Sequence, residues 1–247
     1  MKKITYTLII FLFAITAHQA QDTGGFVFGI KGGPSVGFQK WDNFERDPLF
    51  ATHVVGFIES LPVEGKFAVF VQAGYHVRGS AIRNRLTYNT STGDPVRPPT
   101  RKFKFKNLAL ALGGKQLKPL GANSSWYYMF GIRGEYTIGT NLSEYEDANT
   151  FFGLPVYPAD DENDWVRNIN YGMILGGGID FNLSEHIGMI LELSVSPDFS
   201  NQYRQDPFPN AVDLQGNPRP IEERIIRNNT IELSIGFRFN RVVEYID

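Results

Sequence analysis

Hydrophobic and polar residues alternate along eight stretches of this chain, and a period of two residues is the pattern of a β-strand whose two faces differ. The clearest stretch runs from Trp126 to Ile138, where large apolar residues occupy one face and Arg133, Glu135 and small residues occupy the other. The alternation predicts strands at about residues 25–38, 51–61, 66–78, 101–114, 125–138, 168–183, 186–196 and 228–239.

Two of these stretches contain an irregularity. In the fourth, the apolar positions change parity between Phe105 and Leu108, which predicts a β-bulge near Lys106–Asn107. In the first, Pro34 lies inside the apolar pattern. Because proline lacks the N–H that a central strand donates, Pro34 predicts a bulge or a bend.

Charged residues share the less apolar face with small residues. They are Arg133, Glu135, Asp180, Glu192, Glu232 and Arg238. A soluble β-sandwich would expose these charges and bury the apolar face, whereas a membrane barrel would do the opposite. Alternation alone therefore leaves both architectures open.

The lengths of the connections favour the barrel. Three connections are short or moderate, 62–65, 115–124 and 184–185, and the four that alternate with them are long: 39–50, 79–100, 139–168 and 197–227. Outer-membrane barrels alternate tight turns on one side with extended loops on the other. We therefore expect an all-β protein, an eight-stranded antiparallel up-and-down transmembrane β-barrel with four long extracellular loops and both termini in the periplasm.

In such a barrel the six charged residues face the lumen. Eight strands enclose an interior that side chains fill, and an unpaired buried charge is strongly unfavourable. We therefore interpret Arg133, Glu135, Asp180, Glu192, Glu232 and Arg238 as a structural polar network whose members pair with one another. A small-ligand or ion-binding role for this set remains the alternative.

Aromatic residues on the apolar face gather towards the two ends of the predicted strands. One group is Trp126, Tyr128, Phe181, Phe237 and Phe239, and the other is Tyr75, Tyr136 and Tyr171. Aromatic girdles at both membrane interfaces are typical of outer-membrane barrels. We expect these residues to set the depth of the barrel in the membrane.

The first 20 residues have the features of a secretory signal peptide. Lys2 and Lys3 precede an uncharged apolar run that ends at Ala17, and Ala20 closes a small-residue segment. The run is shorter than the roughly 20 residues that a spanning helix needs. We expect cleavage after Ala20, which leaves residues 21–247 as a single outer-membrane barrel domain.

Composition and motifs give little sign of other chemistry. The chain has no cysteine and a net charge of −2, which argues against thiolate sites and against nucleic-acid binding. His53, His76 and His186 lack metal-ligand spacing, and no nucleophile motif is present. The sequence therefore predicts no catalytic residue, no metal site and no cofactor, with an enzyme at the outer rim as the least favoured alternative.

Two of the predicted loop regions carry opposite charge. Residues 78–106 are basic, and 139–168 are acidic. The acidic loop could bind calcium through its carboxylates, although it lacks the EF-hand spacing, and the basic segment could meet lipopolysaccharide phosphates. Because these regions flank one predicted hairpin, we expect instead that they contact each other across the barrel mouth.

Short motifs in the predicted strands resemble the PorT-like family of eight-stranded outer-membrane β-barrel domains. The matching stretches are 29–33, 71–75, 78–79, 127–134, 176–180 and 233–239. The resemblance covers about residues 24–240. It implies an integral outer-membrane protein of a Gram-negative cell, in contact with outer-membrane lipid and lipopolysaccharide, with a structural or secretion-accessory role. Because the namesake member takes part in type IX secretion, a secretion-machinery protein is the partner that the resemblance implies.

Overall fold

The computed structural model describes most of the chain between residues 25 and 242. The described residues are 25–41, 46–61, 66–83, 87–88, 95–96, 100–147, 157–158, 165–210, 216–218 and 220–242. The expected signal peptide, residues 1–20, lies outside them. Among the described residues, no helix is both long and apolar enough to cross a membrane.

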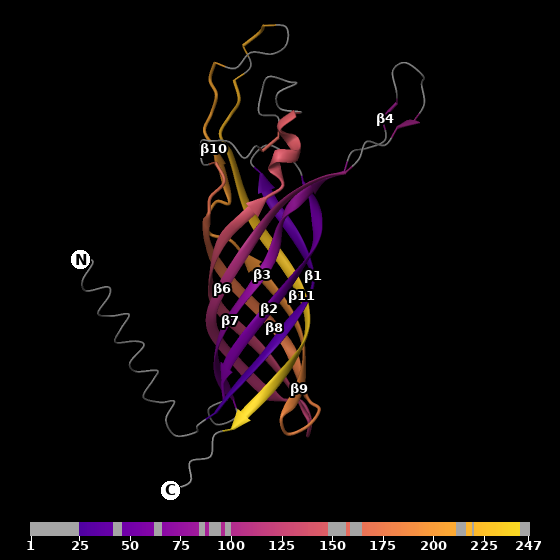
Figure 1. Cartoon of the computed structure of the whole chain (residues 1–247), viewed down its shortest axis with the longest axis vertical. Helices are drawn as coiled ribbons and strands as arrows, with labels where there is room; N and C mark the ends of the chain where they lie inside the picture. Colours follow the sequence, from indigo (N-terminus) through magenta and orange to yellow (C-terminus); the bar gives the residue numbers. More distant parts are fainter. Residues whose placement is uncertain are drawn as a thin grey trace, which may run out of the picture.

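Eight long strands form one closed antiparallel barrel (Figure 1). They are β1 (Gly25–Trp41), β2 (Asp47–Ser60), β3 (Phe67–Ile82), β6 (Arg101–Pro119), β7 (Ser124–Thr140), β8 (Ile169–Asn182), β9 (Ile187–Pro197) and β11 (Arg224–Val242). Each pairs with its neighbours in the chain, and β1 pairs with β11 from Gly25↔Val242 to Trp41↔Ile226. This closure removes the sheet edges, and it confirms the predicted eight-stranded up-and-down barrel.

The two ends of the barrel differ. β1 begins and β11 ends at the lower end in Figure 1, which we call the terminal end, whereas the long connections leave from the upper end, the loop end. Three small strands and a 3₁₀ helix lie in the long connections, where the sequence analysis predicted only loops. They are β4 (Thr87–Tyr88), β5 (Pro95–Val96), β10 (Tyr203–Gln205) and η1 (Leu142–Tyr145).

One predicted connection is much shorter than expected. The segment 115–124 was expected to be a loop, but β6 continues to Pro119, and only residues 120–123 form the turn. The backbone N–H groups of Leu120 and Gly121 donate to the Ser124 carbonyl and close it. The strand continues because Lys115 points into the barrel and finds carboxylates there.

The register does shift at Lys106–Asn107, but the bulge that the sequence predicted in this strand is wrong, because the extra residue lies on the neighbouring strand. Lys106 pairs with Gly139 and Asn107 with Thr137, so the extra residue is Ile138 on β7. β6 itself alternates without interruption, with Phe105 and Asn107 both facing inward. The apolar parity changes because the interior becomes apolar at the loop end.

Pro34 does not produce the bulge that the sequence suggested. The register between β1 and β2 is unchanged from Gly32↔Val54 to Pro34↔Thr52. The register with β11 is likewise the same on both sides of Pro34. The fixed φ of proline is compatible with an extended strand, so Pro34 removes a donor without shifting the pairing.

Large apolar side chains cover the outside of the barrel. Examples are Ile30, Phe50, Leu110, Ile132, Tyr171 and Ile235, each more than half exposed. A soluble monomer rarely exposes a continuous apolar surface of this kind, whereas lipid covers it in a membrane barrel. The predicted girdle residues Trp126 and Phe239 at the terminal end and Tyr136 towards the loop end belong to this surface.

Candidate functional site: the filled interior of the barrel

The interior of the barrel contains an apolar cluster at the loop end, and apolar residues intermixed with polar ones over the rest of its length. The terminal apolar cluster consists of Val27, Phe57, Phe70, Ala111, Tyr127, Met129, Ile174 and Ile190. The loop-end apolar cluster consists of Trp41, Phe103, Phe105, Leu142, Trp165, Tyr203 and Ile226. Strand alternation sends these side chains inward, and the long connections supply Leu142, Trp165 and Tyr203 as a cover. The polar residues are thereby separated from the loop end.

Arg78 is the centre of the charge cluster on the loop side of the interior, and it is completely buried. Its Nε donates to Glu135 Oε1 at 2.9 Å, and its Nη2 lies 2.7 Å from the same oxygen. Its Nη1 donates to the Thr230 hydroxyl. Arg133 Nε lies 3.0 Å from Glu135, and Arg133 also pairs with Asp198. Two arginines and two carboxylates from three segments, β3, β7 and the residue after β9, thus form one buried network.

Two histidines extend this network towards β2. Their rings stack, with centroids 5.6 Å apart. His76 Nδ1 lies 2.7 Å from Glu232 Oε1, and His53 Nε2 lies 2.8 Å from the Ser234 hydroxyl. Among the described residues, no three His, Asp or Glu side chains are grouped as a metal site would require. The buried histidines therefore act as hydrogen-bonding members of the interior.

Lys115 is the centre of a second charge cluster, on the terminal side. Its ammonium lies 3.2 Å from Glu59 and 3.1 Å from Asp180, and 3.8 Å from the centroid of the Tyr127 ring. The Tyr127 hydroxyl donates to Glu192 at 2.8 Å. Glu192 in turn accepts two hydrogen bonds from the Lys31 ammonium, at 2.7 and 2.8 Å. Tyr127 thus connects the two lysine–carboxylate groups.

The structure brings only two of the six predicted network residues into contact with each other, Arg133 and Glu135. Three of the others pair with residues outside the predicted set: Asp180 with Lys115, Glu192 with Lys31 and Glu232 with His76. Arg238 is half-buried near the terminal end, where it donates to Asn182 and Asn240. The expected mutual pairing is therefore wrong for four of the six.

The interior residues that pair with the predicted network, but were not predicted as its members, differ in how the sequence could have identified them. Arg78 and His76 lie on the minority face of their strand, so alternation alone placed them in the lumen. Lys115 and Asp198 lay just beyond the predicted ends of strands, in segments expected to be loops. Lys31 lies in the irregular first strand. Extending each strand by a few residues would have found Lys115 and Asp198.

The middle of the barrel leaves almost no free space. A void of about 10 Å³ lies among residues that include His76, Arg133 and Glu232. This is about the volume that a single water needs. The arrangement holds charged side chains in place and packs them closely around this void.

Comparison with known proteins places this architecture in a family. The profile described as "Outer membrane protein beta-barrel domain" matches residues 18–202. The chain belongs to this family. It is an outer-membrane β-barrel, and no curated protein matches it.

Solved structures similar to this outer-membrane barrel are distant in sequence. OprG from Pseudomonas aeruginosa is 13% identical, with 91% of this chain and 99% of that chain covered and a TM-score of 0.48. Ail of Yersinia pestis, solved with the heparin analogue sucrose octasulfate, is 12% identical, with 87% and 99% covered and a TM-score of 0.41. The outer membrane protease OmpT from Escherichia coli is 9% identical, with 89% and 98% covered and a TM-score of 0.39.

At the loop end of this outer-membrane barrel, the basic and acidic segments meet. The Asn141 side chain donates to the Lys102 carbonyl, the Tyr145 hydroxyl donates to the same carbonyl, and Arg101 lies 4.4 Å from the centroid of the Tyr157 ring. The two segments therefore meet through hydrogen bonds and a cation–π contact. No described carboxylate of 139–168 forms an ion pair with the basic segment. Of the seven carboxylates on which the calcium hypothesis depended, Glu144, Glu146 and Asp147 are described and exposed, whereas Asp160, Asp161, Glu162 and Asp164 lie outside the described residues.

Proposed function

We propose that this protein is a non-conducting, non-enzymatic barrel in the outer membrane of a Gram-negative cell, whose task is performed by its loop end. The observation that carries the proposal is the filled interior. Arg78, Glu135 and Arg133 occupy the middle of the barrel, and the void beside them holds about one water. Neither an aqueous pore nor an interior ligand has room there.

The same feature argues against an enzyme inside the barrel. Ser234 and His53 form a serine–histidine pair at 2.8 Å, which is a geometry that nucleophilic catalysis uses. Both side chains are buried in the interior, beneath the cover that Trp165 and Tyr203 contribute to. A substrate would have to displace that cover to reach them. We interpret the pair as structural.

The proposed role is structural or secretion-accessory, as the PorT-like resemblance implies, with a secretion-machinery protein as the partner. Cleavage after Ala20 would remove the signal peptide and leave both termini in the periplasm. The alternation of short turns with long connections supports an orientation in which the loop end faces outward. The long connections are then the part of the molecule that a partner meets.

Planar-bilayer recording tests the closed interior. The purified barrel is expected to insert without producing ion-current steps, because buried side chains block the cross-section. A porin inserted in the same way is the positive control. Discrete current steps from the wild-type protein would contradict the proposal.

Co-purification in mild detergent tests the accessory role. We expect a stoichiometric partner protein with the full-length barrel, and its loss when residues 206–222, beyond β10, are replaced by a short Gly-Ser linker. A matched replacement of the 184–185 turn leaves the loop end intact and should retain the partner. Retention of the partner by the first variant would argue against recognition by that loop.

A further inference from the structure

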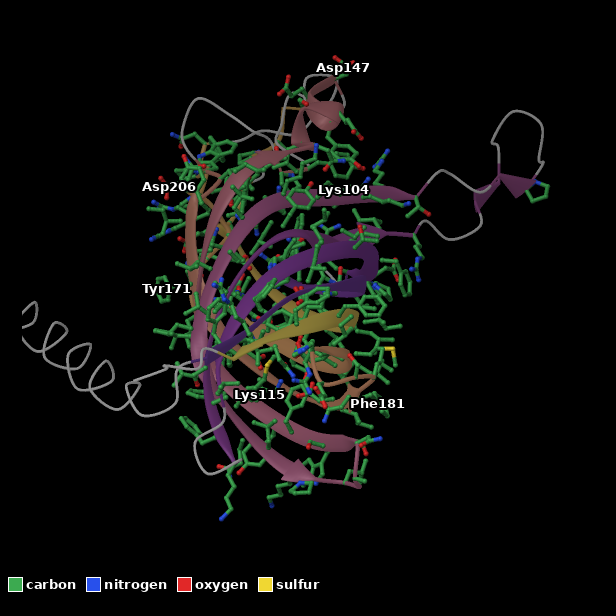
Figure 2. All side chains as sticks on the ribbon, turned by 60° about the horizontal axis from the view of Figure 1, so that its bottom comes forward. Lys104, Lys115, Asp147, Tyr171, Phe181 and Asp206 are labelled. Atoms are coloured by element: carbon green, nitrogen blue, oxygen red, sulfur yellow. The ribbon has the colours of Figure 1, made fainter. Side chains whose placement is uncertain are left out.

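Three lysines line up on the outside of β6 at the loop end. Lys102, Lys104 and Lys106 take alternate positions, so their side chains share the outward face, while Phe103 and Phe105 between them are fully buried. Figure 2 labels Lys104 on this part of the strand. We call these three residues the lysine row.

Nothing in the described part of the chain neutralises the lysine row. No described carboxylate lies within 4.0 Å of its ammonium groups. The acidic side chain on the adjoining helix η1, Glu144, accepts a hydrogen bond from Asn141 instead. On the other side, the ladder partners on β3 are Ala81 for Lys102, Gly79 for Lys104 and Val77 for Lys106, and none of them carries a charge.

An open apolar hollow begins directly below the lysine row on the same strand. Leu108, Leu110 and Leu112 continue the outward face of β6, and the hollow, of about 870 Å³, extends across β7 to β8. Its other lining side chains include Ile132, Tyr136, Ile169 and Tyr171. Figure 2 shows Tyr171 projecting away from the barrel.

Gly134 creates this hollow. It lies between Leu110 and Tyr171 in the ladder and faces outward, and a Cβ placed on it would meet no atom within 4 Å. Most other outward positions of β7 carry large apolar residues such as Ile132 and Tyr136. The missing side chain therefore leaves a depression in a surface that otherwise meets lipid evenly.

We propose that the lysine row and the Gly134 hollow together bind one lipid of the outer leaflet, a glycolipid that carries two phosphates and several acyl chains. This is the chemistry of the lipid A part of lipopolysaccharide. The phosphates would meet the lysine row, and an acyl chain would fill the hollow beneath it. That the loop end lies in the outer leaflet rests on the orientation given under the proposed function.

The spacing of the lysine row favours two phosphates over one. Four residues separate Lys102 from Lys106, which is about 13 Å along a β-strand. A phospholipid headgroup with a single phosphate reaches only part of that length, whereas the two phosphates of lipid A lie at opposite ends of a disaccharide. The lysine row also lies above the hollow, as the phosphates of a lipid lie above its acyl chains, because Lys106 borders Leu108 directly on the outward face.

The barrel provides its own matched control. A second outward hollow, of about 570 Å³, lies towards the terminal end around Gly56, between Phe28, Ile58 and Val71. A Cβ on Gly56 would meet only backbone oxygens at 3.9 Å, so a larger residue is tolerated there too. This hollow has Arg241 beside it but no lysine row.

Native mass spectrometry of the purified full-length barrel in detergent tests the site. The probes are bisphosphorylated lipid A, monophosphorylated lipid A and phosphatidylglycerol, added in titration. We expect bisphosphorylated lipid A to bind about tenfold more tightly than phosphatidylglycerol, with the monophosphorylated form between them. Replacing the lysine row by glutamine should weaken lipid A binding about tenfold or more, and Gly134→Leu should weaken it about threefold.

The controls are Lys118→Gln, an exposed lysine at the terminal end of the same strand, and Gly56→Leu. Both should bind lipid A like the wild type. Equal binding of phosphatidylglycerol, or equal losses in the control and test variants, would overturn the proposal. Because binding is measured on the isolated barrel, this failure would leave the non-conducting interior and the membrane orientation unaffected.

Discussion

At the scale of the residue, Arg78 is the side chain on which the loop-side charge cluster depends, because it contacts both Glu135 and Thr230 while completely buried. Removing one partner of a buried ion pair leaves the other charge without compensation, which costs about 3–5 kcal/mol. Arg78→Met should therefore lower the free energy of unfolding by about that amount. Urea titration of the barrel in lipid vesicles, followed by tryptophan fluorescence, measures the change.

Arg204→Met is the matched control. Arg204 forms a pair of the same length with Glu223, 2.7 Å, but its side chain is 48% exposed. Exposed pairs contribute only about 0–1 kcal/mol. Adding Glu135→Leu to Arg78→Met should recover part of the loss, because it leaves Arg133 and Asp198 as a pair of equal and opposite charges. Equal effects of the Arg78 and Arg204 variants would contradict the importance of burial here.

At the scale of the element, the proposed orientation puts the connections at the two ends of the barrel on opposite sides of the membrane. The chain has no cysteine, so each introduced cysteine is the only reactive thiol. Glu144→Cys on η1 should react with a membrane-impermeant maleimide on intact cells, because its side chain is exposed at the loop end. Glu185→Cys, exposed in the β8–β9 turn, should react only after the outer membrane is permeabilised. The reverse pattern would invert the proposed orientation.

The elements also mark what the sequence could and could not predict. Alternation correctly assigned the outward face of β7, because a period of two is a property of a single strand. It could not identify the interior partners, since Lys31 and Glu192 lie 161 residues apart and meet only because the barrel closes. Phe103 and Phe105 changed the parity of the apolar positions in the strand predicted at 101–114, because apolar residues fill the loop end of the interior as well as the outer surface.

At the scale of the whole molecule, closure through β1 and β11 predicts a barrel that resists detergent. We expect the unheated protein to migrate differently from the boiled protein in SDS gels, because an edge-free sheet does not open until it is heated. Ile231→Pro should lower the temperature at which this difference is lost, because proline removes the one backbone N–H that Ile231, which lies between Val36 and Val195, can donate. Identical migration of the boiled and unheated wild type would contradict a closed barrel.

The seam between β1 and β11 also determines when the barrel can form. Its pairs, such as Phe26↔Arg241, join the first and last strands, so almost the whole domain must be synthesised before they can meet. Contacts of such long sequence separation form slowly, because the loop entropy is lost before the contacts stabilise the fold. Until β11 arrives, β1 and β9 each keep an unpaired edge that lipid cannot satisfy. The chain therefore has no stable partly inserted form, and becomes a membrane protein only when its last strand is complete.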